Sequence, residues 1–450
     1  MNRKNIIWLL TALLGIACDG YLDGVAPEHE LTAEKVLVND DAAEAYTLSI
    51  YTSLVSMDRN LATSVPLYID EMQPTPTSGS NAQEFYSSAL SPDNNTVQSL
   101  WENLYGTIYK CNDAIELLDR ADALTPRIKN QCLGEARFIR AYAYLLLVSL
   151  FGDVPLVTRP DVAYSASAGR TLTKTVLAAV IDDLILAKEL MGTDYVAAAR
   201  IRPNRLAAAA LLARAYLYSG NHVEAESEAS EVLQSPLYRL EPLDSVFLMD
   251  SRETIFQAWN VNGYQLGSSF APGTGLPQYV AAEGLIAAFD LRDLRREKWF
   301  GVTEADGQTY HYLYKYRKTT AGPSTDEYTV GLRLAEQYLI RAEARLRQNQ
   351  PDEAIADIDS IRFRAGLPSV AESYPNAGSE ELLVELLNER YRELFSEWNH
   401  RFADLKRFDM INEVMGAKKS TWTKASQLFP IPATERRINI NLEQNDGYDN

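Results

Sequence analysis

Cys18 is the residue whose position most directly indicates a covalent modification. It follows the apolar run at residues 6–16, which begins just after Arg3 and Lys4. That run is well short of the roughly 20 apolar residues that a membrane-spanning helix needs. A charged start, a short apolar stretch and a small residue before the break are typical of a secretory signal peptide, and a cysteine at the break is typical of a lipoprotein. We expect residues 1–17 to be a signal peptide and Cys18 to be lipidated, with a plain signal peptide as the alternative.

Residues that could perform catalysis do not form a recognisable constellation. The four histidines are not at metal-ligand spacing, and the sequence has no phosphate-binding loop or serine-hydrolase elbow. A glycosidase would need two carboxylates across a bound sugar. Glu393 and Glu397 share one face of a predicted helix, but such a row is more commonly a solvated stripe paired with arginines. We expect no catalytic residues, no metal and no cofactor.

Aromatic side chains outside the predicted repeat helices are the candidates for ligand binding. Rings stack on the apolar faces of sugars or hold the side chains of peptides, and two or three in a cleft are enough for weak capture. The candidates lie in loops or at strand ends, and local packing is the alternative role for each. They are Tyr68, Tyr86, Trp259, Tyr264 and Tyr279, with Asp70 and Asn81 as polar partners.

The elements that must position these residues are mainly helices. Helical periodicity predicts repeat helices over about residues 41–57, 97–151, 202–235, 333–365 and 380–412. Proline, glycine and alternating residues predict insertions of loops and strands over about 58–96 and 237–332. Residues 18–40 are predicted to be an extended, lipidated tether. We expect a single domain over residues 41–450.

Two of the helical segments, residues 209–233 and 338–362, resemble each other. Their alignment places Gly220 on Asn349, so that each segment is a helix, a short polar turn and a second helix. This is the tetratricopeptide pattern, in which each unit buries its apolar face only against its neighbours. The sequence therefore predicts a mainly α fold, a tetratricopeptide-like scaffold of helical repeats with a loop-rich, partly β insertion.

Charge and cysteine content exclude several classes of protein. The 450-residue chain has a formal net charge of −18 at pH 7, so nucleic acid and anionic lipid should repel it. Beyond Cys18 only Cys111 and Cys132 remain, which excludes a framework of several disulfides. These two residues are either one disulfide or, as we expect, two buried thiols.

Motifs in order along nearly the whole chain resemble the SusD/RagB family of lipoproteins. They are residues 18–23, 135–156, 202–220, 333–345, 356–367, 389–407 and 428–448. The resemblance implies a scaffold of four tetratricopeptide units, anchored by its lipid at the surface of the outer membrane. It implies binding of an oligosaccharide or a peptide, without enzymatic activity. It also implies a partner, a SusC-like TonB-dependent β-barrel transporter, which the protein would cover as a lid.

Two other functions remain open. A secreted tetratricopeptide scaffold for protein interactions would share the helical repeats, because such surfaces commonly bind peptides. A glycoside hydrolase is the less favoured function, because Asp70 and Glu71 in the first insertion are the better candidates for its carboxylates, but acidic residues in loops are usually only solvated. The aromatic residues of the insertions favour ligand capture over both.

Overall fold

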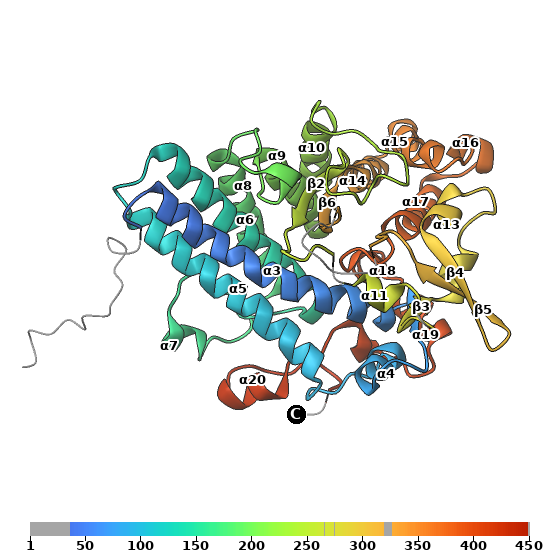
Figure 1. Cartoon of the computed structure of the whole chain (residues 1–450), viewed down its shortest axis with the longest axis horizontal. Helices are drawn as coiled ribbons and strands as arrows, with labels where there is room; N and C mark the ends of the chain where they lie inside the picture. The colour runs from blue at the N-terminus through green and yellow to red at the C-terminus, as the bar shows by residue number, and fades with distance from the viewer. Residues whose placement is uncertain (1–36, 265, 274, 319–325, 449–450) are drawn as a thin grey trace, which may run out of the picture.

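The structure is a computed structural model that describes residues 37–264, 266–273, 275–318 and 326–448. The predicted signal peptide, the predicted lipidation site Cys18 and most of the predicted tether therefore lie outside the described residues. Within them the fold is mainly helical, as the sequence predicts (Figure 1).

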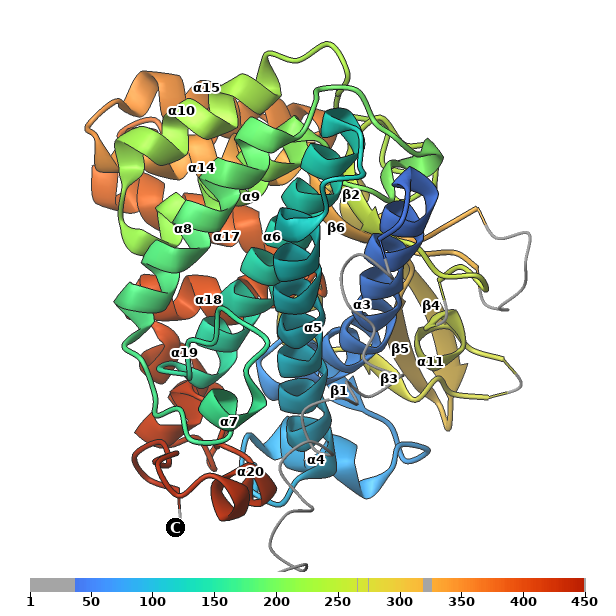
Figure 2. The same cartoon turned by 90° about the vertical axis from the view of Figure 1, so that its left-hand side faces the viewer.

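Long helices pack one on the next through most of the chain (Figures 1 and 2). In order they are α5 (Asn95–Arg120), α6 (Pro126–Phe151), α8 (Thr173–Leu190), α9 (Arg205–Ser219), α10 (His222–Leu233), α14 (Leu334–Arg347) and α15 (Pro351–Arg364). Each helix buries its apolar face against its neighbours, which is how helical repeat proteins are built. The predicted tetratricopeptide-like scaffold is confirmed.

The two predicted repeat units have the same turn between their helices. Gly220 ends α9 with φ of 80°, and Asn349, its aligned partner, follows α14 with φ of 61°. Glycine and asparagine are the residues that adopt this left-handed conformation most readily. Ala225 and Ala229 of α10 are buried in one cluster with Ala344 of α14, although the second insertion separates these helices in the sequence. The helix stack is therefore continuous, and the insertion begins and ends at neighbouring points of it.

Helix α8, between α6 and α9, is an element that the sequence reasoning missed. Its buried residues include Val176, Val180 and Leu184, at the spacing of one helix face. The opposite face also carries apolar side chains, because Ile185 and Leu186 are exposed. The contrast between the two faces is therefore weak, and the periodicity in the sequence is weak with it.

The boundary between the first predicted helix and the first predicted insertion lies further along the chain than the sequence predicts. The helix predicted over residues 41–57 continues to Tyr68 as α3 (Asp40–Tyr68), and α4 (Ser80–Ser87) is a second helix inside the predicted loop. Pro66 lies in the last turn of α3, where its missing N–H removes one backbone hydrogen bond of the helix. The N–H of Ile69 still donates to the carbonyl of Val65 and closes the helix.

The helix predicted over about 380–412 is interrupted. α17 (Ser379–Leu394) and α18 (His400–Arg407) are joined by a turn in which Ser396 and Trp398 have positive φ, 53° and 55°. Such a conformation costs a residue other than glycine roughly 1–2 kcal/mol. Packing offsets that cost, because the Trp398 ring meets the Tyr142 ring edge-on at 3.9 Å between centroids.

The β structure consists of short antiparallel pairs. In the described part of the chain these are β1 (Met72–Pro74) with β3 (Tyr279–Ala281), β2 (Thr254–Ala258) with β6 (Thr329–Arg333), and β4 (Phe300–Ala305) with β5 (Gln308–Leu313). The second predicted insertion is thus partly β, as expected. Short helices α12 (Glu283–Ala287) and α13 (Leu294–Lys298) join β3 to β4, and the β4–β5 hairpin projects from the body at the right of Figure 1.

Cys111 and Cys132 are buried and are not joined in a disulfide, which confirms the expectation of two thiols. None of the helices described here is long and apolar enough to cross a membrane.

A buried network of ion pairs connects the second insertion to the helix stack. Its acidic members are Glu253, Asp293, Glu389, Glu393 and Glu397, and its basic members are Arg295, Lys315, Arg333 and Arg364. Glu393 of α17 accepts hydrogen bonds from Arg295 at 2.8 Å and Arg333 at 2.7 Å, and it also pairs with Arg364. The network therefore connects α13, β6, α15 and α17.

The interpretation of Glu393 and Glu397 as a solvated stripe is wrong. The two residues are 0% and 7% exposed, and their arginine partners are buried with them. Burial alone would raise the pKa of both carboxyls, but the surrounding guanidinium groups outweigh it and lower the pKa of Glu393 well below its usual value. The carboxylates therefore stay charged inside the protein, where they hold its parts together.

Replacement of Glu393 by glutamine should strongly destabilise the fold. Three guanidinium groups would then face a neutral amide away from water, and removal of one partner of a buried ion pair costs about 3–5 kcal/mol. Urea denaturation measures this loss. The control is Glu380→Gln, an exposed position in the first turn of the same helix, which should cost no more than about 1 kcal/mol. Equal losses in both variants would contradict a structural role for the network.

The network also predicts a loss of stability in acid. A carboxyl whose pKa is lower in the folded than in the unfolded chain stabilises the fold above the unfolded pKa, and this contribution is lost as the pH falls through the folded pKa. Despite burial, Arg295 and Arg392 lower the pKa of Glu389 from 4.5 to about 2. The free energy of unfolding should therefore decrease from pH 4.5 to about 2, and it should decrease less steeply in Glu389→Gln. Identical slopes for the two proteins would count against this assignment.

Candidate functional site

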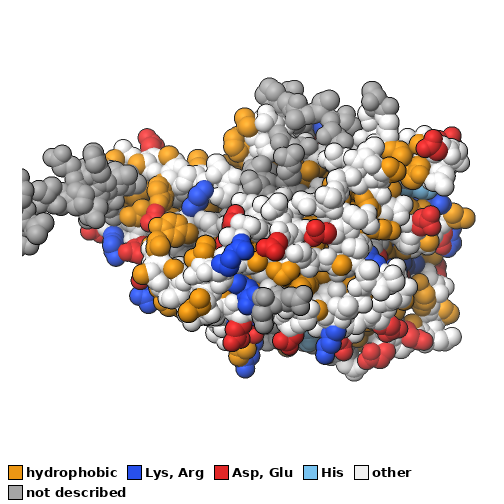
Figure 3. All heavy atoms as spheres, turned by 90° about the horizontal axis from the view of Figure 1, so that it is seen from below, with side chains coloured by type: hydrophobic (Ala, Val, Ile, Leu, Met, Phe, Trp, Pro, Cys, Tyr) orange, Lys and Arg blue, Asp and Glu red, His pale blue; other side chains and the backbone are white. Residues whose placement is uncertain are grey.

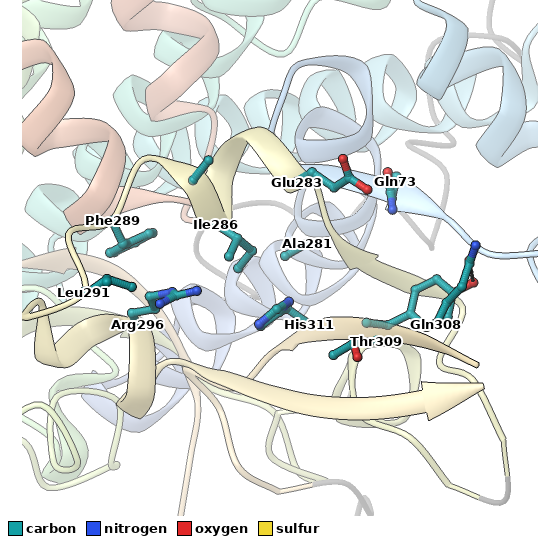
Figure 4. A pocket seen from close by; sticks show the side chains of 12 residues that line it. Gln73, Ala281, Glu283, Ile286, Phe289, Leu291, Arg296, Gln308, Thr309 and His311 are labelled. Carbon is teal, nitrogen blue, oxygen red and sulfur yellow. Dashed lines mark hydrogen bonds between the residues drawn. The ribbon is translucent and has the colours of Figure 1, made fainter. Parts of the chain in front are cut away.

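A pocket of about 710 Å³ lies between the β4–β5 hairpin, other parts of the second insertion and strand β1 of the first (Figure 4). Its lining comes from β1, β3, α12, α13, the loop between these two helices, and β5. The lining residues are Gln73, Ala281, Glu283, Ile286, Ala287, Phe289, Leu291, Arg296, Gln308, Thr309, Tyr310 and His311. Both the volume and the mixture of apolar surface with a few polar groups are usual for sites that bind small molecules.

The β4–β5 hairpin forms one wall of the pocket, and its turn fixes its shape. Asp306 and Gly307 are the two loop residues, with φ of 53° and 75°. Positive φ at both positions matches the twist of a two-residue hairpin, for which Asp-Gly is a favoured sequence. At Gly301 the ring of Tyr312 lies directly over the neighbouring strand, because a Cβ there would be 2.0 Å from it.

The opposite wall is held by aromatic packing. Phe289, in the loop between α12 and α13, meets Phe300 edge-on at 5.4 Å and Phe395 edge-on at 6.0 Å between ring centroids. Phe289 is therefore anchored to β4 and to the end of α17. These contacts keep the loop in place beside the hairpin.

Helix α13 is positioned by the buried network. Arg295 is fully buried and bonds Asp293, Glu389 and Glu393 at 2.7–2.8 Å. The next residue in the helix, Arg296, lines the pocket instead. The ion pairs on one side of this short helix thus determine which side chain it presents to the pocket.

The polar groups of the pocket lie at two ends. Arg296 and His311 are near each other at one end, and Glu283 and Gln73 are at the other (Figure 4). Burial lowers the pKa of His311 below its usual value, and the nearby Arg296 guanidinium lowers it further, so the imidazole is neutral at pH 7. Glu283 is the only carboxylate among the described residues that line the pocket, whereas glycoside hydrolysis normally uses two. No group of acidic, histidine or cysteine residues suited to a metal ion occurs in the described chain.

Three of the ligand-binding residues predicted from the sequence are buried, and the prediction for them is wrong. Tyr68 is 0% exposed, and its hydroxyl donates to the Ser426 carbonyl at 2.7 Å inside an aromatic cluster. Asp70 is buried in ion pairs with Arg401 and Lys418. Tyr264 is also buried and stacks on another ring, that of Tyr316, at 3.8 Å between centroids. The proline-rich stretch predicts an exposed loop, but Tyr68 and Asp70 within it contribute to the core.

The other four predicted residues are accessible, but none lines the pocket. Asn81 is exposed and Tyr86 half-buried on α4, where the Lys419 ammonium lies 5.3 Å from the Tyr86 ring. Trp259 is 40% exposed just after β2. Tyr279, half-buried on β3, is two residues from Ala281, which does line the pocket. Their role in binding stays a prediction.

The sequence reasoning missed the residues that do form the pocket. One signal was available, since Asp306-Gly307 stands between two alternating segments and predicts a hairpin. That hairpin would have pointed to Gln308–His311 as a single surface. No comparable signal connects Gln73 with Arg296, because the fold alone brings them to one pocket.

Comparison with known proteins gives two matching family models. One, described as the SusD family, matches residues 301–448, and the other, described as "starch-binding associating with outer membrane", matches residues 22–217. A SusD-like protein of Formosa agariphila is 25% identical over 99% of this chain and 99% of its own length. The chain belongs to the SusD/RagB family.

Solved structures of SusD-like proteins have the same fold. A SusD superfamily protein from Bacteroides vulgatus is similar with a TM-score of 0.78, at 21% identity over 91% of this chain and 99% of that one. A laminarin-binding SusD-like protein gives a TM-score of 0.79, at 22% identity over 91% of this chain and 100% of that one. At such identities the likeness establishes the tetratricopeptide-like helical fold of the family and nothing finer.

The surface of this SusD-like protein shows a mixture of charges. On the face shown in Figure 3, acidic and basic side chains are interspersed, and the basic ones form no broad area. Recognition of nucleic acid requires a basic patch or stripe. The face in Figure 3 does not offer one.

Proposed function

We propose that the protein captures oligosaccharides at the cell surface, and that the pocket between α12, α13 and β5 is where it holds them. The observation that carries this proposal is the lining of the pocket, in which amide, hydroxyl and charged groups surround apolar surface. A sugar is complementary to this lining, because the hydroxyls at its edge can bond the polar groups and the C–H groups on its faces can pack on the apolar surface. Family membership supports the same class of ligand, since one matching family model is described as starch-binding and one relative binds laminarin.

The side chains can be given separate tasks in sugar binding. Tyr310 on β5 is half-buried, and its hydroxyl donates to Gln308 at 2.8 Å, which fixes the ring for stacking. Gln73 and Thr309 supply donors and acceptors for sugar hydroxyls. Asn81, Tyr86, Trp259 and Tyr279 are proposed as outer contacts for a longer chain.

The proposed role is capture without chemistry. One carboxylate in the pocket supplies at most one of the two groups that hydrolysis of a glycosidic bond normally needs. The protein is therefore proposed to release its ligand unchanged. The sequence and family support a destination for it, a SusC-like TonB-dependent β-barrel transporter, with this protein as a lid over the barrel.

The lid mechanism assigns a role to the N-terminal segment. After removal of residues 1–17, the lipid on Cys18 would hold the protein at the outer membrane, and residues 18–40 would tether the body. A tether lets the body swing open for capture and close for delivery. Closure requires a difference of only a few kcal/mol when the ligand contacts both proteins.

Replacement of Tyr310 by alanine should weaken glycan binding by about 1 kcal/mol, the scale of one aromatic contact. The measurement is retardation of the purified protein in gels that contain single polysaccharides, laminarin among them, followed by titration calorimetry with the best ligand. The control is Tyr164→Ala, which removes an exposed ring from α7 (Val162–Ser165), far from the hairpin in Figure 1. If no glycan retards the wild type, or if the two variants bind equally, this site is wrong.

Replacement of Cys18 by alanine should move the protein from the membrane to the soluble fraction. The wild type should carry fatty acid by mass spectrometry and should co-purify with a β-barrel transporter from detergent-solubilised membranes. The variant should lose both properties while its circular dichroism stays unchanged, because residue 18 precedes the folded body. Membrane retention of Cys18→Ala would reject the anchor, and a wild type purified without any barrel would reject the lid mechanism.

A further inference from the structure

We propose that the pocket selects acidic oligosaccharides, with a carboxylate or sulfate ester of the sugar bound between Arg296 and His311. This inference rests on the proposed function and narrows it to one class of glycan. Both sources of negative charge present the same chemistry, an oxyanion with two or three acceptor oxygens. The observations that lead to it are the pairing, the placement and the surroundings of Arg296.

The guanidinium group of Arg296 makes no hydrogen bond or ion pair with any residue that the structure describes. The residue is half-buried at the wall of the pocket. Its neighbours on the chain differ in this respect. Arg292 bonds Asp290 at 2.9 Å, and Arg295 is saturated by the three carboxylates of the buried network.

This lack of a partner is unexpected from composition. The chain has 61 acidic residues and 43 basic ones, so carboxylates are in excess for any arginine. Within the described residues none forms an ion pair with Arg296, and the one carboxylate in the lining, Glu283, lies at the other end of the pocket (Figure 4). A cation left unpaired at a concave surface can satisfy its donors with a bound anion.

The positions of Arg296 and His311 suit a single anion. In Figure 4 the two side chains point toward each other across one end of the pocket. The flat guanidinium fork can donate two parallel hydrogen bonds to a carboxylate or a sulfate. His311 is neutral at neutral pH and can donate one more from its ring N–H. The backbone of Arg296 is held beside the pocket, because Arg295, the preceding residue of α13, is fixed in the buried network.

The net charge of the protein excludes one other cause of a preference for acidic glycans. A net charge of −18 repels acidic polysaccharides at a distance. General attraction therefore cannot produce a preference for acidic over neutral glycans. Such a preference requires a local cationic site, and the pocket contains one at Arg296.

The test measures affinity for acidic polysaccharides and for neutral forms of the same backbones. One arm uses polygalacturonate, alginate and hyaluronan, each beside its carboxyl-reduced form. A second arm uses sulfated galactans beside their desulfated forms, so that the two sources of the anion are distinguished. We expect the tightest ligand to be acidic and its neutral form to bind about tenfold more weakly, the scale of a hydrogen-bonded contact to a charged group.

Variants of Arg296 assign the preference to this residue. Arg296→Gln should lower affinity for the acidic ligand about tenfold and leave affinity for the neutral form unchanged. Arg296→Lys should keep part of the preference, since it retains the charge and loses the fork. Arg292→Gln is the matched control, because it removes the same charge four residues away from an exposed site outside the pocket. Thermal melting should show that all three variants are folded.

The outcomes separate this inference from the proposed function. Equal binding of acidic and neutral forms, or an acidic preference that survives in Arg296→Gln, would overturn the inference and leave glycan capture standing. Failure of every glycan in both arms and of laminarin would overturn glycan capture and the inference with it. An acidic preference that Arg296→Gln removes and Arg292→Gln keeps would support both.

Discussion

Charges buried away from water must be balanced within the protein, and this requirement determines how the two halves of the molecule fit together. Glu393 alone contacts arginines from α13, β6 and α15. These ion pairs join parts of the insertion to the helix stack, so they favour the mutual arrangement that the structure shows. Replacement of such networks by apolar residues can stabilise proteins, so a network of this kind contributes specificity more than stability. Here that specificity reaches the pocket through Arg295, whose anchoring presents Arg296.

The sequence predicts correctly those features that depend on residues close to one another along the chain. The repeat units are visible because their small alanines and their turn residues recur at one spacing, and Gly220 and Asn349 indeed share a conformation. The features that failed depend on distant parts of the chain. Glu393 is buried because α13, β6 and α15 pack against it, and the residues near it in the sequence do not indicate that burial. The prediction that Tyr68 binds a ligand is wrong for the same reason, since its ring packs against residues more than 300 positions away in the sequence.

The candidate site shows the same division. One wall, the β4–β5 hairpin, has a local signature in Asp306 and Gly307, whereas the pocket as a whole joins Gln73 to residues 281–311. Aromatic content indicated the second insertion, which supplies most of the pocket, but Tyr264 in that insertion is buried against another ring. The pocket combines polar groups with apolar surface that includes Phe289 and Tyr310, and the aromatic packing and the buried network hold its walls in place. Walls held in this way reduce the conformational entropy that is lost when a ligand binds, since the groups that contact the ligand are already in place.

The stack of helices is continuous across the second insertion, because α10 packs directly on α14. The two ends of the inserted segment are therefore attached to adjacent, fixed points, which is the condition under which one segment can be exchanged for another of different length. A laboratory exchange between relatives would succeed or fail on the ionic contacts at the junction. A transplanted segment must bring cations equivalent to Arg295, Lys315 and Arg333, or the host must lose Glu389, Glu393 and Glu397 at the same time. Recognition loops on this scaffold are thus modular only together with the charges beneath them.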